Sequence, residues 1–284
     1  MELEELNAVE RPEPDTIRKL PWFIDVFCYP ISVSGLTILG IYVFTPVVLD
    51  LAGLGLSVVG YPALLSMLVV LALAAIDLIV TAYVFWYFSM CIHESAVGKV
   101  RAPEMLNKII ADDTTDTILD LLRIVSCVFI CVGPGLTYYS ITHRLDWVLW
   151  LLLGSGIFFL PMVLLATVMF GSFGGLNPII VIPSILSTFF WYWLVLSAFC
   201  VPAGIIVAVS TFLPGHSVGV FGYILRGVHT ILTFATGLPV SLPEHNIGII
   251  SFLLRGVYAY LALVAAHILG RFYYRNAERL CWEV

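Results

Sequence analysis

The segment GHSVG at 215–219 has the G-x-S-x-G spacing of serine hydrolases, with Ser217 in the position of the nucleophile. Ser217 would need a general base, and His229 or His267 could supply one. The motif normally follows a strand and starts a helix, whereas a long apolar run precedes it here. An intramembrane serine hydrolase could dispense with the sheet, but Val218 breaks the tighter G-x-S-G pattern of such enzymes. Hydrolysis through Ser217 is therefore the least favoured function.

The histidines and cysteines do not form a complete ligand set for a metal or a cofactor. Cys127 and Cys131 lie one helical turn apart and could share a metal ion, but no further ligand follows at a suitable spacing. His267 would bind haem only with a second histidine at the same depth, for which His229 is the sole candidate. We therefore expect no cofactor, no metal site and no catalytic residue.

Asp77 is the clearest candidate for chemistry inside a membrane, because it lies in the middle of an apolar run with no charge nearby in sequence. A charged side chain at the centre of a spanning helix costs at least about 2.5 kcal/mol, so Asp77 should face the interior of a bundle. Arg255 could pair with it, and His267 is a third polar group in the apolar runs. An ion pathway and a structural polar lock both fit Asp77. The lock is favoured, because no second acid lies at comparable depth.

Transmembrane helices must position these residues, as the composition indicates. Of 284 residues, 61% are hydrophobic and 11% are charged, and the mean hydropathy is +1.03. Apolar runs of about twenty residues have the length that an α-helix needs to cross a bilayer. The predicted fold class is therefore all-α, a polytopic transmembrane helical bundle of about six spans with short interfacial helices. We place the spans at about 33–52, 62–92, 118–139, 146–170, 185–212 and 247–271.

The remaining segments complete the predicted organisation. Residues 1–20 form an acidic polar tail, and residues 21–284 form one transmembrane helical domain, which begins with a short interfacial helix at 21–30. Residues 213–246 form either a re-entrant segment or a surface loop. The net charge is −6 and the basic residues are scattered, so we expect no binding to nucleic acid.

Lysine and arginine in the short polar segments predict the orientation, because such residues favour the cytoplasmic side. They gather in the N-terminal tail, in the loop at 93–117 and at the C-terminus, so both termini should be cytoplasmic. The loop and the segment at 171–185 would then share that side. A candidate docking surface for a partner or for lipid headgroups follows there, consisting of Lys99, Arg101, Lys108, Asn177 and Pro178.

The segment GSFGGLNPIIVIPSI at 171–185 has no charge but three glycines and two prolines. The glycines allow a turn with positive φ, and Asn177 followed by Pro178 is typical of a helix start. Pro183 should end this helix, because proline disrupts a helix interior. We therefore predict a short interfacial helix from Leu176 to about Ile182, too short to cross the membrane.

Two stretches, YFSMCIHESAVGKVRAP and PMVLLATVMFGSFGGLNPIIVIPSILSTFFWYWLV, resemble the Yip-type superfamily of polytopic membrane proteins, in particular its prokaryotic members of unknown function. The resemblance extends loosely over residues 85–284. It implies a multi-pass protein of the cytoplasmic membrane of a prokaryote. It transfers no catalytic residue, and the trafficking role of eukaryotic relatives does not carry over, because their signature is absent.

The expected function is that of a non-catalytic integral membrane protein, a scaffold or accessory subunit of a membrane complex. Its partners would be membrane lipids and other subunits of that complex. A transporter or channel for a small solute, an ion or a lipid, working through Asp77, is the alternative.

Overall fold

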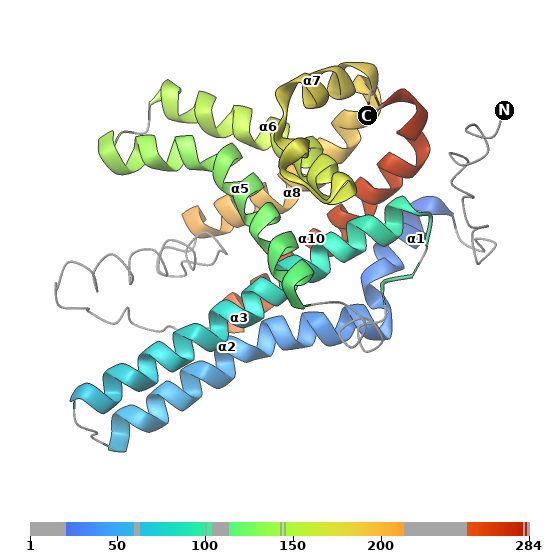
Figure 1. Cartoon of the computed structure of the whole chain (residues 1–284). Helices are drawn as coiled ribbons and strands as arrows, with labels where there is room; N and C mark the ends of the chain where they lie inside the picture. The colour runs from blue at the N-terminus through green and yellow to red at the C-terminus, as the bar shows by residue number, and fades with distance from the viewer. Residues whose placement is uncertain are drawn as a thin grey trace. The chain divides into compact units, whose positions relative to one another are not determined.

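The computed structural model describes residues 21–59, 63–99, 101–103, 114–142, 144, 146–212, 249–280 and 282. These residues form helices and include no strand (Figure 1). Four of the described helices are long and apolar enough to cross a membrane. The number of candidate spans rises to six if each of two bent helix pairs counts as one. The predicted all-α polytopic bundle is therefore confirmed.

A helix occupies most of each predicted span. The positions of the spans in a membrane and the cytoplasmic placement of the termini stay predictions. The elements are α1 Trp22–Cys28, η2 Tyr29–Ile31, α2 Val33–Val59, α3 Ala63–Ala96, α5 Thr114–Thr142, α6 Trp147–Phe170, η3 Phe173–Leu176, α7 Pro178–Ser187, α8 Phe189–Phe212, α10 Ile249–Asn276 and η4 Ala277–Arg279.

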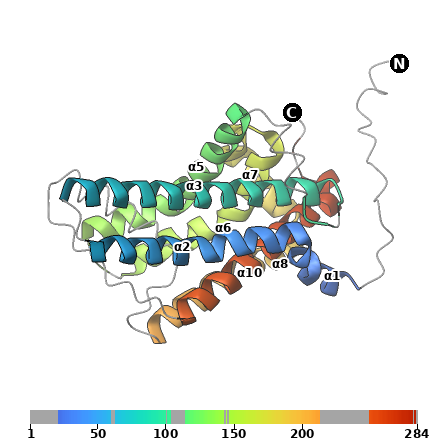
Figure 2. The same cartoon turned by 90° about the horizontal axis from the view of Figure 1, so that it is seen from below.

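The chain divides into two compact units. Unit 1 consists of Met1–Gly35, Trp86–Phe199 and Leu263–Val284, and unit 2 consists of Leu36–Phe85 and Cys200–Ala262. In unit 2 the α2 and α3 segments run side by side (Figure 1, Figure 2). A small apolar core in unit 2 contains Tyr42, Val43, Ala259, Leu39 and Val84.

In unit 1, α5 and α6 form an antiparallel hairpin whose turn is closed by Asp146. The Asp146 carboxylate accepts a hydrogen bond from the backbone N–H of Leu149 at 3.1 Å, which caps the first turn of α6. It also accepts a bond of 2.6 Å from the Tyr138 hydroxyl of α5. The pKa of Asp146 therefore lies below its ordinary value, since the Tyr138 hydrogen bond favours the carboxylate.

The two helices of the hairpin pack through small residues. A Cβ atom added at Gly156 of α6 would lie 1.9 Å from the carbonyl oxygen of Cys131 in α5. A Cβ atom at Gly135 would lie 2.5 Å from Cδ2 of Leu153. Small residues at such contacts are typical of membrane helices, whose association depends on close packing.

Glycine also shapes the connection from α6 to α7. The α6 helix ends at Gly171, which has φ +54° in the left-handed region, as the sequence predicts for a glycine turn. Gly175 serves a different purpose, because its Cβ atom would lie 2.4 Å from the backbone nitrogen of Thr167. The connection therefore folds back tightly against the last turn of α6.

The short helix predicted after this turn exists, and it begins at Pro178, two residues after the predicted Leu176, which ends η3. The Asn177 side chain accepts a hydrogen bond of 3.0 Å from the backbone N–H of Ile179, and Pro178 is the first helical residue. Its end differs, because α7 continues through Pro183 to Ser187.

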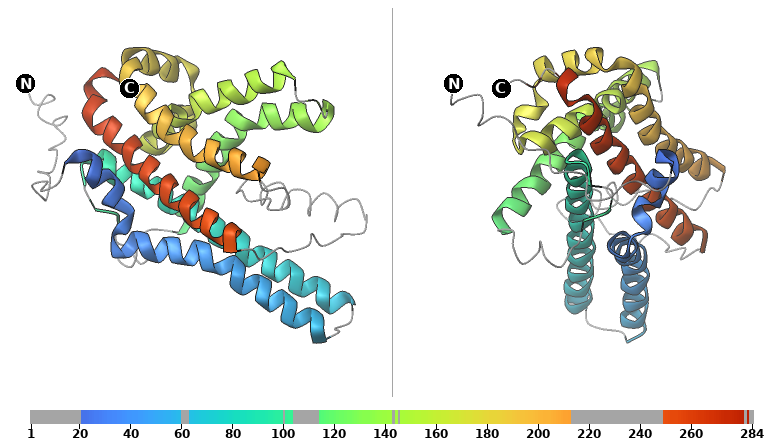
Figure 3. Two further views of the ribbon diagram at one scale, coloured as in Figure 1. Left: turned by 180° about the vertical axis from the view of Figure 1, so that it is seen from behind. Right: turned by 90° about the vertical axis from the view of Figure 1, so that its right-hand side faces the viewer.

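Packing explains why Pro183 does not end α7. Val181, Ser184 and Ile185 are buried on one face, so the residues before and after the proline are held against the bundle together. The helix ends instead at Thr188, whose hydroxyl donates a bond of 2.6 Å to the Ser184 carbonyl. The chain then bends by 106° into α8 (Figure 3).

We predict that Gly156→Ala destabilises the protein by about 1–3 kcal/mol, because the new methyl group would force α5 and α6 apart. Thermal unfolding in detergent measures the effect. Gly154→Ala is the matched control on the same helix, since nothing lies within 4 Å of its added Cβ atom. A Gly156→Ala protein that melts like the Gly154→Ala protein would contradict this account of the hairpin.

Candidate functional site

His267 lies fully buried in the α10 portion of unit 1. Its Nδ1 atom is 2.7 Å from the Ser95 hydroxyl at the end of α3, and its ring stacks on Tyr29 at a centroid distance of 4.0 Å. The Ser95 hydroxyl also lies 3.5 Å from the Tyr29 hydroxyl. Three elements distant in sequence therefore meet through one polar cluster.

A serine beside a histidine is the pairing that hydrolases use, but the surroundings of this pair leave no space for a substrate. Ser95 and His267 are both 0% exposed. One turn further along α10, a Cβ atom added at Gly270 would lie 2.4 Å from the Ile92 carbonyl oxygen and 2.5 Å from Cβ of Ser95. The Ser95–His267 pair is therefore a contact between packed helices and can act as a polar lock.

Two charged interactions extend this cluster beyond the end of α3. Lys99, one of the predicted docking residues, forms an ion pair with the buried carboxylate of Glu94. Arg271 of α10 donates a hydrogen bond of 3.0 Å to the carbonyl oxygen of Gly98, which has φ +101°. The turn that follows α3 is thus tied to α10.

Asp77 and Arg101 lie among the described residues, and several other predicted candidates do not. Asp77 lies half-buried in the candidate span Leu71–Ala96, in unit 2. Arg255 lies in α10, but its side chain is outside the described residues, so the pairing with Asp77 and a transporter role stay predictions. Arg101 is exposed. Outside the described residues lie Lys108, Ser217, His229 and the whole segment 213–246.

Cys127 and Cys131 do not form part of a larger ligand group within the part of the chain that the structure describes. The Cys127 thiol donates to the Thr167 hydroxyl at 3.1 Å in the α5–α6 contact. Among the described residues, no group of three or more histidine, cysteine, aspartate or glutamate side chains could hold a metal ion.

A pocket of about 240 Å³ lies in unit 1 between the end of α3, the start of α5 and the end of α6. Its polar lining consists of Ser89, His93, Asp120, Arg123 and Thr167. Asp120 and Arg123 form an ion pair across one turn of α5. This pocket was not predicted, although an aspartate and an arginine three residues apart at the head of a span are a visible signal.

No protein-family model matches this chain, and neither a curated protein nor a solved structure matches it. The resemblance to the Yip-type superfamily stays a prediction.

We predict that Ser95→Ala destabilises the protein by about 1–3 kcal/mol, because it removes a hydrogen bond from the buried His267 ring. Chemical denaturation in detergent measures the change in the free energy of unfolding. Ser89→Ala is the control, because the Ser89 hydroxyl is also buried in α3 but bonds the Trp86 carbonyl of its own helix. Equal losses in the two variants would show that the contact with His267 contributes no more than a bond within one helix.

Proposed function

We propose that this chain is a non-catalytic, multi-pass protein of a prokaryotic cytoplasmic membrane that acts as a scaffold or accessory subunit of a membrane complex. The observation that supports the proposal most is the open apolar face of α7. Ile179, Ile182 and Leu186 follow at helical spacing and are 77%, 46% and 68% exposed. The opposite face of the same helix is buried against unit 1.

The helix that carries this face is held firmly. The indole Nε1–H of Trp282, near the C-terminus, donates a hydrogen bond of 2.9 Å to the Ser184 hydroxyl in α7. The Trp282 ring also stacks on Tyr273 at 5.2 Å and packs against Phe170 at 5.1 Å. A surface with a fixed shape binds a partner without a large loss of conformational entropy.

The length of α7 favours a role in binding a partner over a role in crossing the membrane. Ten residues give a helix of about 15 Å, half of the hydrocarbon thickness, so α7 cannot span by itself. Its exposed isoleucine and leucine side chains must be covered by lipid or by protein. We propose that a helix of a partner subunit covers them.

Two buried polar groups of unit 1, Glu94 and His267, agree with the absence of catalysis in this proposal. Glu94 is buried and pairs with Lys99, and His267 contacts Ser95 and Tyr29 in the packed interior. Groups engaged in this way stabilise the fold. They lack the access to substrate that a general acid or base needs.

We predict that a photo-crosslinking amino acid at position 186 forms an adduct of one defined mass with a membrane protein in native membranes. The control carries the same amino acid at position 147, where Trp147 is 75% exposed at the start of α6. Mass spectrometry of the adducts identifies the partner. Lipid adducts alone at position 186, or the same proteins at both positions, would contradict the scaffold role, as would a chain that elutes alone in mild detergent.

A further inference from the structure

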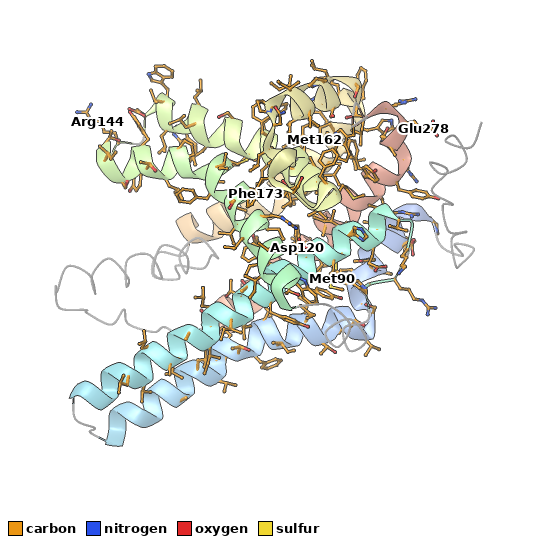
Figure 4. The ribbon with its side chains drawn as sticks, viewed as in Figure 1. Met90, Asp120, Arg144, Met162, Phe173 and Glu278 are labelled. Carbon is orange, nitrogen blue, oxygen red and sulfur yellow. The ribbon has the colours of Figure 1, made fainter. Side chains whose placement is uncertain are left out.

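The pocket between α3, α5 and α6 lies where three candidate spans have their ends. His93 is in the last turn of α3, Asp120 and Arg123 are near the start of α5, and Thr167 is in the last turn of α6. Figure 4 shows Asp120 and Met90 where α5 and α3 approach each other, far from Arg144 at the other end of the α5–α6 hairpin. Phospholipid headgroups occupy this level of a bilayer.

The rim of the pocket carries charges of both signs. The Arg123 side chain is 22% exposed, and its Nη1 atom pairs with Oδ1 of Asp120, which is 44% exposed. A guanidinium group has five N–H donors. The pair with Asp120 engages Nη1, so the Arg123 guanidinium can still donate hydrogen bonds to an acceptor in the pocket. His93, exposed on α3, supplies a further nitrogen donor across the pocket.

The inner wall is apolar, and its hydroxyl groups are already bonded. Trp86, Met90 and Ile124 are buried and line the pocket. The Ser89 hydroxyl donates to the Trp86 carbonyl at 2.7 Å, and the Thr167 hydroxyl accepts from Cys127. The inner wall therefore offers contact area to carbon atoms and leaves polar recognition to the rim.

The volume limits what the pocket can hold. About 240 Å³ is below the range of about 300–1,000 Å³ that pockets for drug-sized ligands occupy. The ligand is therefore small, or the pocket takes one end of a larger molecule. A bare phosphate suits Arg123 and His93 but is repelled by Asp120, whereas a headgroup with both a phosphate and an ammonium group satisfies all three.

We propose that this pocket binds a phosphoethanolamine group, with the phosphate on Arg123 and His93 and the ammonium on Asp120. The position at the ends of the spans points to a phospholipid headgroup as its source. This binding goes beyond the scaffold role and does not depend on it, because the pocket and the exposed face of α7 consist of different residues.

Lipid binding to the purified full-length protein in detergent tests the proposal. Native mass spectrometry would measure affinity for phosphatidylethanolamine and phosphatidylglycerol, and calorimetry would measure affinity for free phosphoethanolamine. We expect Arg123→Gln to weaken phosphatidylethanolamine binding about tenfold or more, because a charge-assisted hydrogen bond is lost. Arg144→Gln is the matched control and should bind as the unchanged protein does, since Arg144 lies at the other end of the hairpin.

A second variant tests the ammonium contact. Asp120→Asn should weaken phosphatidylethanolamine binding but not phosphatidylglycerol binding, since the glycerol headgroup has no ammonium and its phosphate is no longer repelled by a carboxylate. Both substitutions should leave the melting temperature without lipid nearly unchanged, because a partly exposed ion pair contributes about 0–1 kcal/mol. That measurement separates lost binding from lost folding.

The outcomes decide between the alternatives. If free phosphoethanolamine binds in a way that depends on Arg123 and the lipids do not bind, the site is supported. Its ligand is then a soluble compound. Equal losses in Arg123→Gln and Arg144→Gln, or binding that does not change in Arg123→Gln, would overturn the proposal. An Asp120→Asn protein that still prefers phosphatidylethanolamine would overturn the ammonium contact.

Discussion

Close backbone contact at glycine residues holds the helices of unit 1 together. At Gly156, Gly175 and Gly270 an added Cβ atom would lie within 2.4 Å of a backbone atom of another segment. In a bilayer the lipid tails are as apolar as leucine, so no hydrophobic effect draws two spanning helices together. Close packing, together with hydrogen bonds between helices, must therefore supply the association. The Ser95–His267 bond and the Cys127–Thr167 bond both lie at such contacts.

The same contacts bring polar side chains to one end of the packed helices. Charged groups avoid the hydrocarbon core because of their hydration cost, so they gather where helices begin or end. In unit 1 the last turns of α3 and α6 and the first turns of α5 form a pocket with His93, Asp120 and Arg123 at its rim. The turn after α3 adds the Glu94–Lys99 pair. Binding of headgroups and of partner subunits would both be expected at such an end.

Local sequence was sufficient for the helices and for some of their ends. Asn177 followed by Pro178 predicts the start of α7, because a cap and a fixed φ act within a few residues. The prediction that Pro183 ends the helix is wrong, because burial of Val181 and Ile185 on either side outweighs the tendency of proline to end a helix. His267, one of the two bases considered for Ser217, contacts Ser95, 172 residues earlier in the chain. Only tertiary packing determines such a contact, so spacing along the sequence could not reveal it.

We propose that the end of α3, the α6–α7 connection and the pocket share one boundary of the membrane, and that the α5–α6 turn lies at the other. Labelling of single cysteines with an impermeant reagent, in a background without native cysteines, tests this most directly. Cysteines at the exposed positions Gly174, Arg101 and Arg144 serve as the probes. We predict labelling at 174 and 101 from the cytoplasmic side only, and at 144 from the opposite side only. Labelling of 174 and 144 from the same side would contradict the account.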